Sequence, residues 1–181
     1  KLPLYIYATI PFVWKFGLTE ISVRLLSAIS GIFTIAATYF LTFTLFRSRF
    51  TALAAAFVLA VMPWHIHISR VESEAIVATL FITLSILMSF QGFTDKNPKK
   101  LLIGAILASL TLYTYHGTHI STPLLFLGIA ISFRKEIIEN ISQYWKPAIV
   151  GFILSFIILL ATGAGADTTK LSGISIFGDP T

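Results

Sequence analysis

Long apolar runs alternate with short polar segments along the whole chain. The runs cover residues 23–46, 50–62, 75–90, 101–115, 120–133 and 147–162. A helix needs about 20 apolar residues to cross a bilayer, so the shorter runs can span it only if their helices continue into the neighbouring polar residues. We therefore predict an all-α fold, a polytopic transmembrane bundle of about six spans.

Residues 1–18 precede the first long run. Residues 3–18 are apolar and aromatic but short for a span, and their tyrosine and tryptophan side chains suit the membrane–water interface. We predict an interfacial amphipathic helix here, closed by Gly17. Thr19 is then the expected cap of the first span, with Glu20 near the positive end of the helix dipole.

A second surface segment is predicted near the other end of the chain. Residues 136–146 have an amphipathic pattern that is typical of a helix at the membrane surface. Pro147 follows and is expected to open the last span, because proline favours the first turn of a helix. Residues 163–181 are rich in Gly, Ser and Thr, which predicts an outer loop.

The composition agrees with a membrane protein. The chain is 56% hydrophobic and 12% charged, whereas a soluble domain carries about 25% charged residues. The absence of cysteine excludes a disulfide framework and a thiolate metal site. The net charge of +5 indicates membrane topology and not nucleic-acid binding, because the basic residues lie in short connections between apolar runs.

Basic residues also sort the connections into two groups. Residues 47–50, 94–100 and 134–146 together carry eight Lys and Arg, and the N-terminal segment and the other connections carry five. The richer group is predicted to face the cytoplasm. This places residues 63–74, 115–119 and 163–181 together on the outer side.

The ends of the chain suggest a longer protein. The sequence begins at Lys1 without an initiator Met or a signal cleavage site. We expect an N-terminal span and a first outer loop to precede Lys1 in the intact protein.

The most polar segment between the runs is Pro63-Trp-His-Ile-His-Ile-Ser-Arg-Val-Glu-Ser-Glu74. Charged and imidazole groups beside a membrane span are costly unless they face water, a partner or a ligand. Arg70 and Glu74 are four residues apart, so on one helix they would face the same way. They could form an ion pair, or Arg70 could bind an anion while Glu74 positions that anion or a substrate hydroxyl. Glu72 would project away from that face into the headgroup region.

All four histidines fall on the predicted outer side, as His65, His67, His116 and His119. With a glutamate they could form a zinc site, although H-x-H and H-x-x-H are weak patterns. The alternative is that they cap helices or donate hydrogen bonds at the interface. No cofactor is assigned, and a divalent cation is left open.

Several short motifs appear in order along the chain. They are Lys1-Leu-Pro-Leu-Tyr5, Phe16-Gly-Leu-Thr-Glu20, Arg24-Leu-Leu-Ser-Ala28, Pro63-Trp-His-Ile66, Ser69-Arg70 with Glu74, Tyr113-Thr-Tyr-His116 and Pro123-Leu-Leu125. This set resembles the dolichyl-phosphate-mannose protein mannosyltransferase-like family of the GT-C class, which includes prokaryotic relatives and the aminoarabinose transferases of lipid A. Residues 172–180 also resemble the outer loop that follows the spans in prokaryotic members.

The resemblance implies a GT-C-like membrane enzyme that takes a sugar from a polyprenyl-phosphate-linked donor. It would transfer the sugar, with inversion, to a protein, lipid or glycan acceptor on the extracytoplasmic face of a prokaryotic plasma membrane. The leaving group is a lipid phosphate, and Lys and Arg stabilise its developing charge.

The resemblance also implies roles for individual residues. Lys1 and Arg70 would contact the donor phosphate, and the catalytic acid would lie upstream of Lys1. The residues expected to orient the sugar or the acceptor are His65, Glu74, Tyr115 and His116. A transporter or flippase for a lipid or an anion is the first alternative, because it needs the same cations. A metal-dependent hydrolase that uses the outer histidines is the second.

Overall fold

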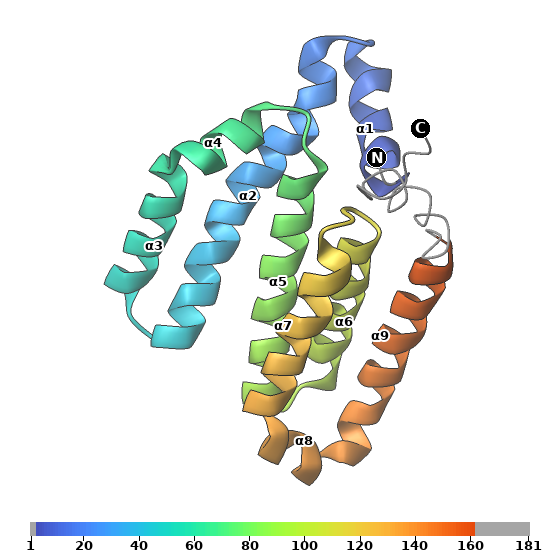
Figure 1. Ribbon diagram of the computed structural model, residues 1–181. Helices are drawn as coiled ribbons and strands as arrows, with labels where there is room; N and C mark the ends of the chain where they lie inside the picture. Colours follow the sequence, from blue (N-terminus) through green and yellow to red (C-terminus); the bar gives the residue numbers. More distant parts are fainter. Residues whose placement is uncertain (1–2, 162–181) are drawn as a thin grey trace, which may run out of the picture.

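The computed structural model describes residues 3–161 (Figure 1). Within this range the chain forms nine helices and no strand, so the all-α prediction is confirmed. The helices are α1 (Pro3–Phe16), α2 (Glu20–Phe46), α3 (Arg49–Val61), α4 (Pro63–Arg70), α5 (Glu74–Thr94), α6 (Pro98–Leu112), α7 (Thr118–Ser132), α8 (Arg134–Glu139) and α9 (Ile141–Ala161).

Two of these helices, α2 and α5, are long and apolar enough to cross a membrane. Helices α3 and α4 together pass the same test, but they are bent by 59° at the break between them. Length and composition thus account for up to three spans among residues 3–161, and the expected six spans stay a prediction.

Helix α2 buries its small residues and exposes its large ones. Its cap is Thr19, as predicted, and the Thr19 side chain accepts a hydrogen bond from the backbone N–H of Ser22. Large apolar side chains such as Ile32 and Phe33 face outward. This pattern is typical of membrane helices, because small residues let neighbouring backbones approach closely. The buried residues of α2 are Ser22, Ser27, Ser30, Gly31, Thr34 and Ala37.

The bend between α3 and α4 lies at Met62 and Pro63. Met62 is extended, with φ −67° and ψ 120°, because a residue before proline is disfavoured in the helical region. Pro63 then starts α4, where its missing N–H costs no helix hydrogen bond. As a result α4 runs across α2 and does not continue along α3 (Figure 1).

Helix α1 pairs with the first half of α2. It ends at Phe16, before Gly17 in the left-handed conformation with φ 74°, so the predicted helix and its closing glycine are confirmed. The Tyr5 hydroxyl lies 2.8 Å from Oγ of Ser27 on α2. The orientation of α1 at the membrane surface stays a prediction.

The connections lie at two ends of the bundle. Figure 1 shows the α2–α3 turn, the α5–α6 turn and α8 at one end, and α4 and the α6–α7 connection toward the other. Lys100 ties the α5–α6 turn together through an ion pair of 2.5 Å with Asp95. Among residues 3–161 the structure therefore groups the connections as the sequence predicted, and the assignment of the basic end to the cytoplasm stays a prediction.

One predicted boundary is wrong. Pro147 does not open the last span: it lies inside α9, which already begins at Ile141. The separate helix in this region is only α8, from Arg134 to Glu139, and its position at the membrane surface stays a prediction. A proline inside a helix removes a single backbone hydrogen bond, here to the carbonyl of Gln143, and α9 accommodates that loss. The predicted loop at 163–181 lies outside the described residues.

Candidate functional site

The polar segment at 63–74 is built against α1 and α2 at one end of the bundle. An apolar cluster of Tyr5, Ile76 and Val77 joins α1 to the first turns of α5. Ile68 of α4 packs on the same cluster. This contact places both sides of the polar segment, the end of α4 and the start of α5, beside α1.

Ser27 connects three helices at this point. Its hydroxyl accepts a hydrogen bond of 3.1 Å from the backbone N–H of Ser73, which immediately precedes α5. The same oxygen lies 2.8 Å from the Tyr5 hydroxyl of α1. Ser27 is fully buried and Tyr5 is 1% exposed, so the junction is shielded from water.

His65 docks α4 on α2. Its Nε2 atom lies 3.3 Å from the backbone carbonyl oxygen of Gly31, and the residue is only 2% exposed. His67, two residues later, is exposed. The ring of His65 could therefore reach a substrate only if α4 moved away from α2.

Arg70 and Glu74 lie on different helices, so the prediction that they share one helical face is wrong. Helix α4 ends at Arg70, Val71 is extended with φ −94° and ψ 161°, and α5 begins at Glu74. Within residues 3–161 the two side chains form no ion pair with each other. Arg70 is exposed, and Glu74 is half-buried at the positive end of α5.

The other described cations near this end have local partners. Arg24 forms an ion pair of 2.5 Å with Glu20, one helical turn earlier. The Lys15 ammonium lies 5.5 Å from the centre of the Phe16 ring. Arg70 makes no ion pair, hydrogen bond or ring contact within residues 3–161. Its guanidinium is consequently available to bind an anion.

The α6–α7 connection carries the other predicted contacts. Thr118 fixes it, since its hydroxyl donates to the backbone oxygens of Thr111 at 2.8 Å and Tyr115 at 2.6 Å. Nε2 of His119 lies 2.9 Å from the carbonyl oxygen of Leu112. Tyr115 and His116 are exposed at the turn, and the rings of His116 and His119 stack edge to face with centres 5.4 Å apart.

The described part of the chain contains no group of side chains suited to bind a metal ion. No three His, Asp or Glu side chains between residues 3 and 161 come together in a group that could hold a metal ion. His65 and His119 instead contact backbone carbonyl oxygens. The metal-dependent hydrolase alternative is therefore unsupported in this range.

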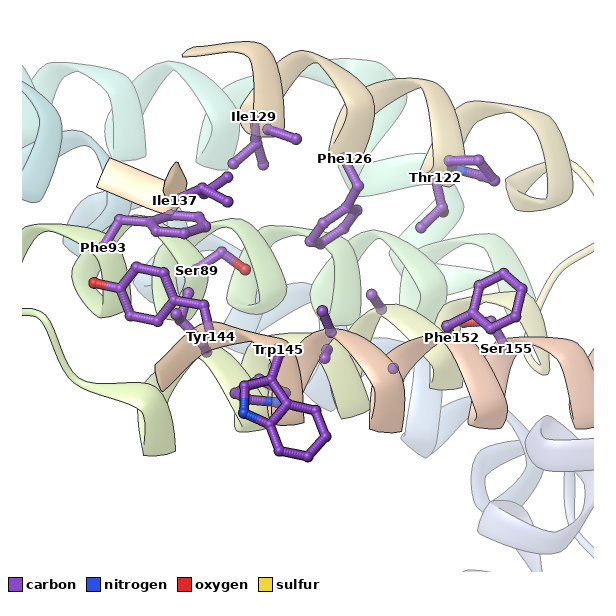
Figure 2. A pocket seen from close by; sticks show the side chains of 18 of the residues that line it. Ser89, Phe93, Thr122, Phe126, Ile129, Ile137, Tyr144, Trp145, Phe152 and Ser155 are labelled. Carbon is purple, nitrogen blue, oxygen red and sulfur yellow. The ribbon is translucent and has the colours of Figure 1, made fainter. Parts of the chain in front are cut away.

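Two hollows lie among the described helices. A polar one of about 360 Å³ lies at the start of α2, where Glu20 and Arg24 face Glu72. An apolar groove of about 530 Å³ lies among α5, α6, α7, α8 and α9. Figure 2 shows Phe126 and Ile129 of α7 on one side of this groove and Tyr144 and Phe152 of α9 on the other.

Sequence analysis did not identify the residues that hold the polar segment in place. The sequence places Ser27 and Tyr5 in an apolar run, in a surface helix and in two family motifs, but assigns them no role in holding this segment. A signal was present, because small residues recur on one face of α2 from Ser22 to Ala37 and so mark its packing face. Lys1, the second predicted phosphate contact, lies outside the described residues.

Comparison with known proteins identifies a family that the chain matches. The family model for dolichyl-phosphate-mannose-protein mannosyltransferase matches residues 1–164. An uncharacterized protein of Aquifex aeolicus (strain VF5) is 28% identical over 142 residues, which cover 77% of this chain and 28% of that protein. The chain thus spans less than a third of that relative. No solved structure shows significant similarity to the chain.

Proposed function

The chain belongs to the dolichyl-phosphate-mannose-protein mannosyltransferase family, and on that premise we propose that the intact protein is a membrane glycosyltransferase. Its donor is a sugar linked to a polyprenyl phosphate, and its acceptor is a protein, lipid or glycan on the extracytoplasmic face of a prokaryotic plasma membrane. The match over residues 1–164 is the observation that carries this proposal.

The proposed reaction requires a positive charge at the polar end of the bundle. The acceptor hydroxyl attacks the anomeric carbon, and the bond from that carbon to the phosphate oxygen breaks. Negative charge then develops on the lipid phosphate, so a cation positioned there in advance lowers the barrier. Arg70 suits this role because it is exposed at the end of α4 without a partner within residues 3–161. Lys1 is proposed as a second cation.

The remaining proposed contacts surround the sugar. Glu74, at the start of α5, can accept hydrogen bonds from sugar hydroxyls, and Tyr115 and His116 are exposed on the α6–α7 turn. His65 holds α4 in place in this proposal, because its ring is buried against Gly31. The proton acceptor for the attacking hydroxyl is expected in sequence that precedes Lys1 in the intact protein.

A lipid-linked donor also needs an apolar surface. The groove lined by Phe126, Ile129 and Phe152 is apolar along almost all of its length. We assign the isoprenoid tail of the donor to this groove, since burial of each CH₂ group contributes about 0.8 kcal/mol.

Arg70→Ala in the intact protein tests the phosphate assignment. Hydrogen bonds to charged groups are worth about 1.5–3 kcal/mol, so kcat/KM for a labelled polyprenyl-phosphate sugar should fall roughly 10- to 100-fold. Arg49→Ala is the matched control, because Arg49 is an exposed arginine at the opposite end of the bundle. An Arg70→Ala enzyme with the kinetic constants of the wild type would show that Arg70 does not bind the donor phosphate.

A further inference from the structure

Two positions on one face of α2 hold the two sides of the polar segment. Ser27 and Gly31 are one helical turn apart, so both face the same neighbours. Ser27 accepts the hydrogen bond from the N–H of Ser73 at the start of α5. Helix α4 packs against Gly31, because His65 Nε2 lies 3.3 Å from the carbonyl oxygen of Gly31. Residues 71–73, the link between α4 and α5, lie between these two anchors.

The anchor at Ser27 depends on its hydroxyl. The Ser73 N–H is one of the first backbone donors of α5, and the Ser73 side chain makes no capping hydrogen bond of its own. Ser27, itself fully buried, supplies an acceptor 3.1 Å away. Tyr5 adds a hydroxyl contact from α1, at 2.8 Å to Ser27 Oγ. The link is therefore fixed to α2 across 46 residues of sequence.

We propose that Ser27 is a positioning residue for sugar transfer, which acts through Ser73 to fix the separation of Arg70 and Glu74. This inference rests on the proposed function. Ser27 does not touch the substrate in this account. Its hydroxyl holds the first turn of α5, and with it Glu74, at a set place relative to the end of α4.

Kinetics of the intact protein test the inference. Ser27→Ala should raise the KM for the polyprenyl-phosphate sugar about tenfold, because the N–H of Ser73 loses its acceptor. Tyr5→Phe should have a smaller effect, since the bond between Ser27 and Ser73 remains. Ser85→Ala is the matched control: Ser85 is a buried serine that bonds across helices, donating from α5 to the carbonyl oxygen of Gly104 on α6 at 2.6 Å. It should leave the donor KM unchanged.

A second measurement does not depend on transfer activity. Nitroxide labels on the exposed residues Leu18 and Val71 report the distance from the start of α2 to the link. Pulsed electron spin resonance should give a narrow distance distribution for the parent protein and Ser85→Ala, and a broader one for Ser27→Ala.

The outcomes separate the two proposals. If Arg70→Ala lowers kcat/KM for the donor and Ser27→Ala leaves the donor KM unchanged, the positioning role is wrong and the proposed function stands. If Ser27→Ala broadens the distance distribution while Arg70→Ala leaves kcat/KM for the donor unchanged, the link is anchored as described but the proposed phosphate contact is wrong. Unchanged distances in Ser27→Ala would also overturn the positioning role.

Discussion

Nε2 of His65 lies 3.3 Å from the backbone carbonyl oxygen of Gly31, so α4 packs directly on α2. The absence of a side chain at Gly31 permits this approach, because an added Cβ would overlap Oγ of Ser69. Ser69 lies one turn after His65 on the same face of α4, and its hydroxyl donates to the His65 carbonyl oxygen at 2.7 Å. The position of Arg70 therefore depends on a glycine 39 residues earlier in the sequence.

Gly31→Ala should destabilise the protein and displace α4. Overpacking of a tight contact costs about 1–3 kcal/mol, and the clash involves both Oγ and Cβ of Ser69. Denaturant titration of the intact protein in detergent measures the effect. Gly128→Ala is the matched control, since an added Cβ meets nothing within 4 Å there. It should be neutral or stabilising by about 0.5–1 kcal/mol. Equal stability of the two variants would contradict the tight packing at Gly31.

The two histidines of the α6–α7 connection should respond differently to replacement. His119→Ala removes the contact between Nε2 and the Leu112 carbonyl oxygen, so it should lower the free energy of unfolding by about 1 kcal/mol. His116→Ala, at an exposed position, should lower kcat/KM for transfer with little change in stability. Thermal unfolding and transfer kinetics on both variants check this. A reversed pattern would move the substrate contact from His116 to His119.

Membrane topology can be tested with single cysteines, because the chain contains none of its own. His67 and Thr94 are exposed and lie toward opposite ends of the bundle. In intact cells an impermeant maleimide should label His67→Cys, whereas Thr94→Cys should react only after permeabilisation. Labelling of both from outside would contradict the bundle topology. Labelling of Thr94→Cys alone would contradict the orientation that the basic residues predict.

Local signals in the sequence predicted most of the helices. Thr19 caps α2 as expected, because a threonine before an apolar run satisfies an orphan N–H at the helix start. The break before Pro63 also follows a local rule, since the preceding residue avoids the helical region. These features need only a few neighbouring residues, which explains why pattern reading found them.

Features that depend on distant contacts were missed. Residues 71–73 contain neither proline nor glycine, and Ser73, a residue type that favours helix starts, was the local sign that Arg70 and Glu74 lie on separate helices. The break is held by Ser27, 46 residues before Ser73. Pro147 is a local signal that predicted a helix start where the structure has none. Helix α9 continues through it, because the packing of α9 on α6 outweighs one lost hydrogen bond. An example of that packing is the bond of 3.3 Å from Ser109 Oγ to the Gly151 carbonyl oxygen.

The proposed transfer reaction is tested most directly by its mass balance. The intact protein, in liposomes, is supplied with a polyprenyl-phosphate sugar labelled in both the sugar and the lipid, together with candidate acceptors. The account predicts one free lipid phosphate for each sugar attached to acceptor, and a strong loss of both products in Arg70→Ala but not in Arg49→Ala. Movement of the intact donor across the bilayer without release of lipid phosphate would contradict it and would identify a transporter instead.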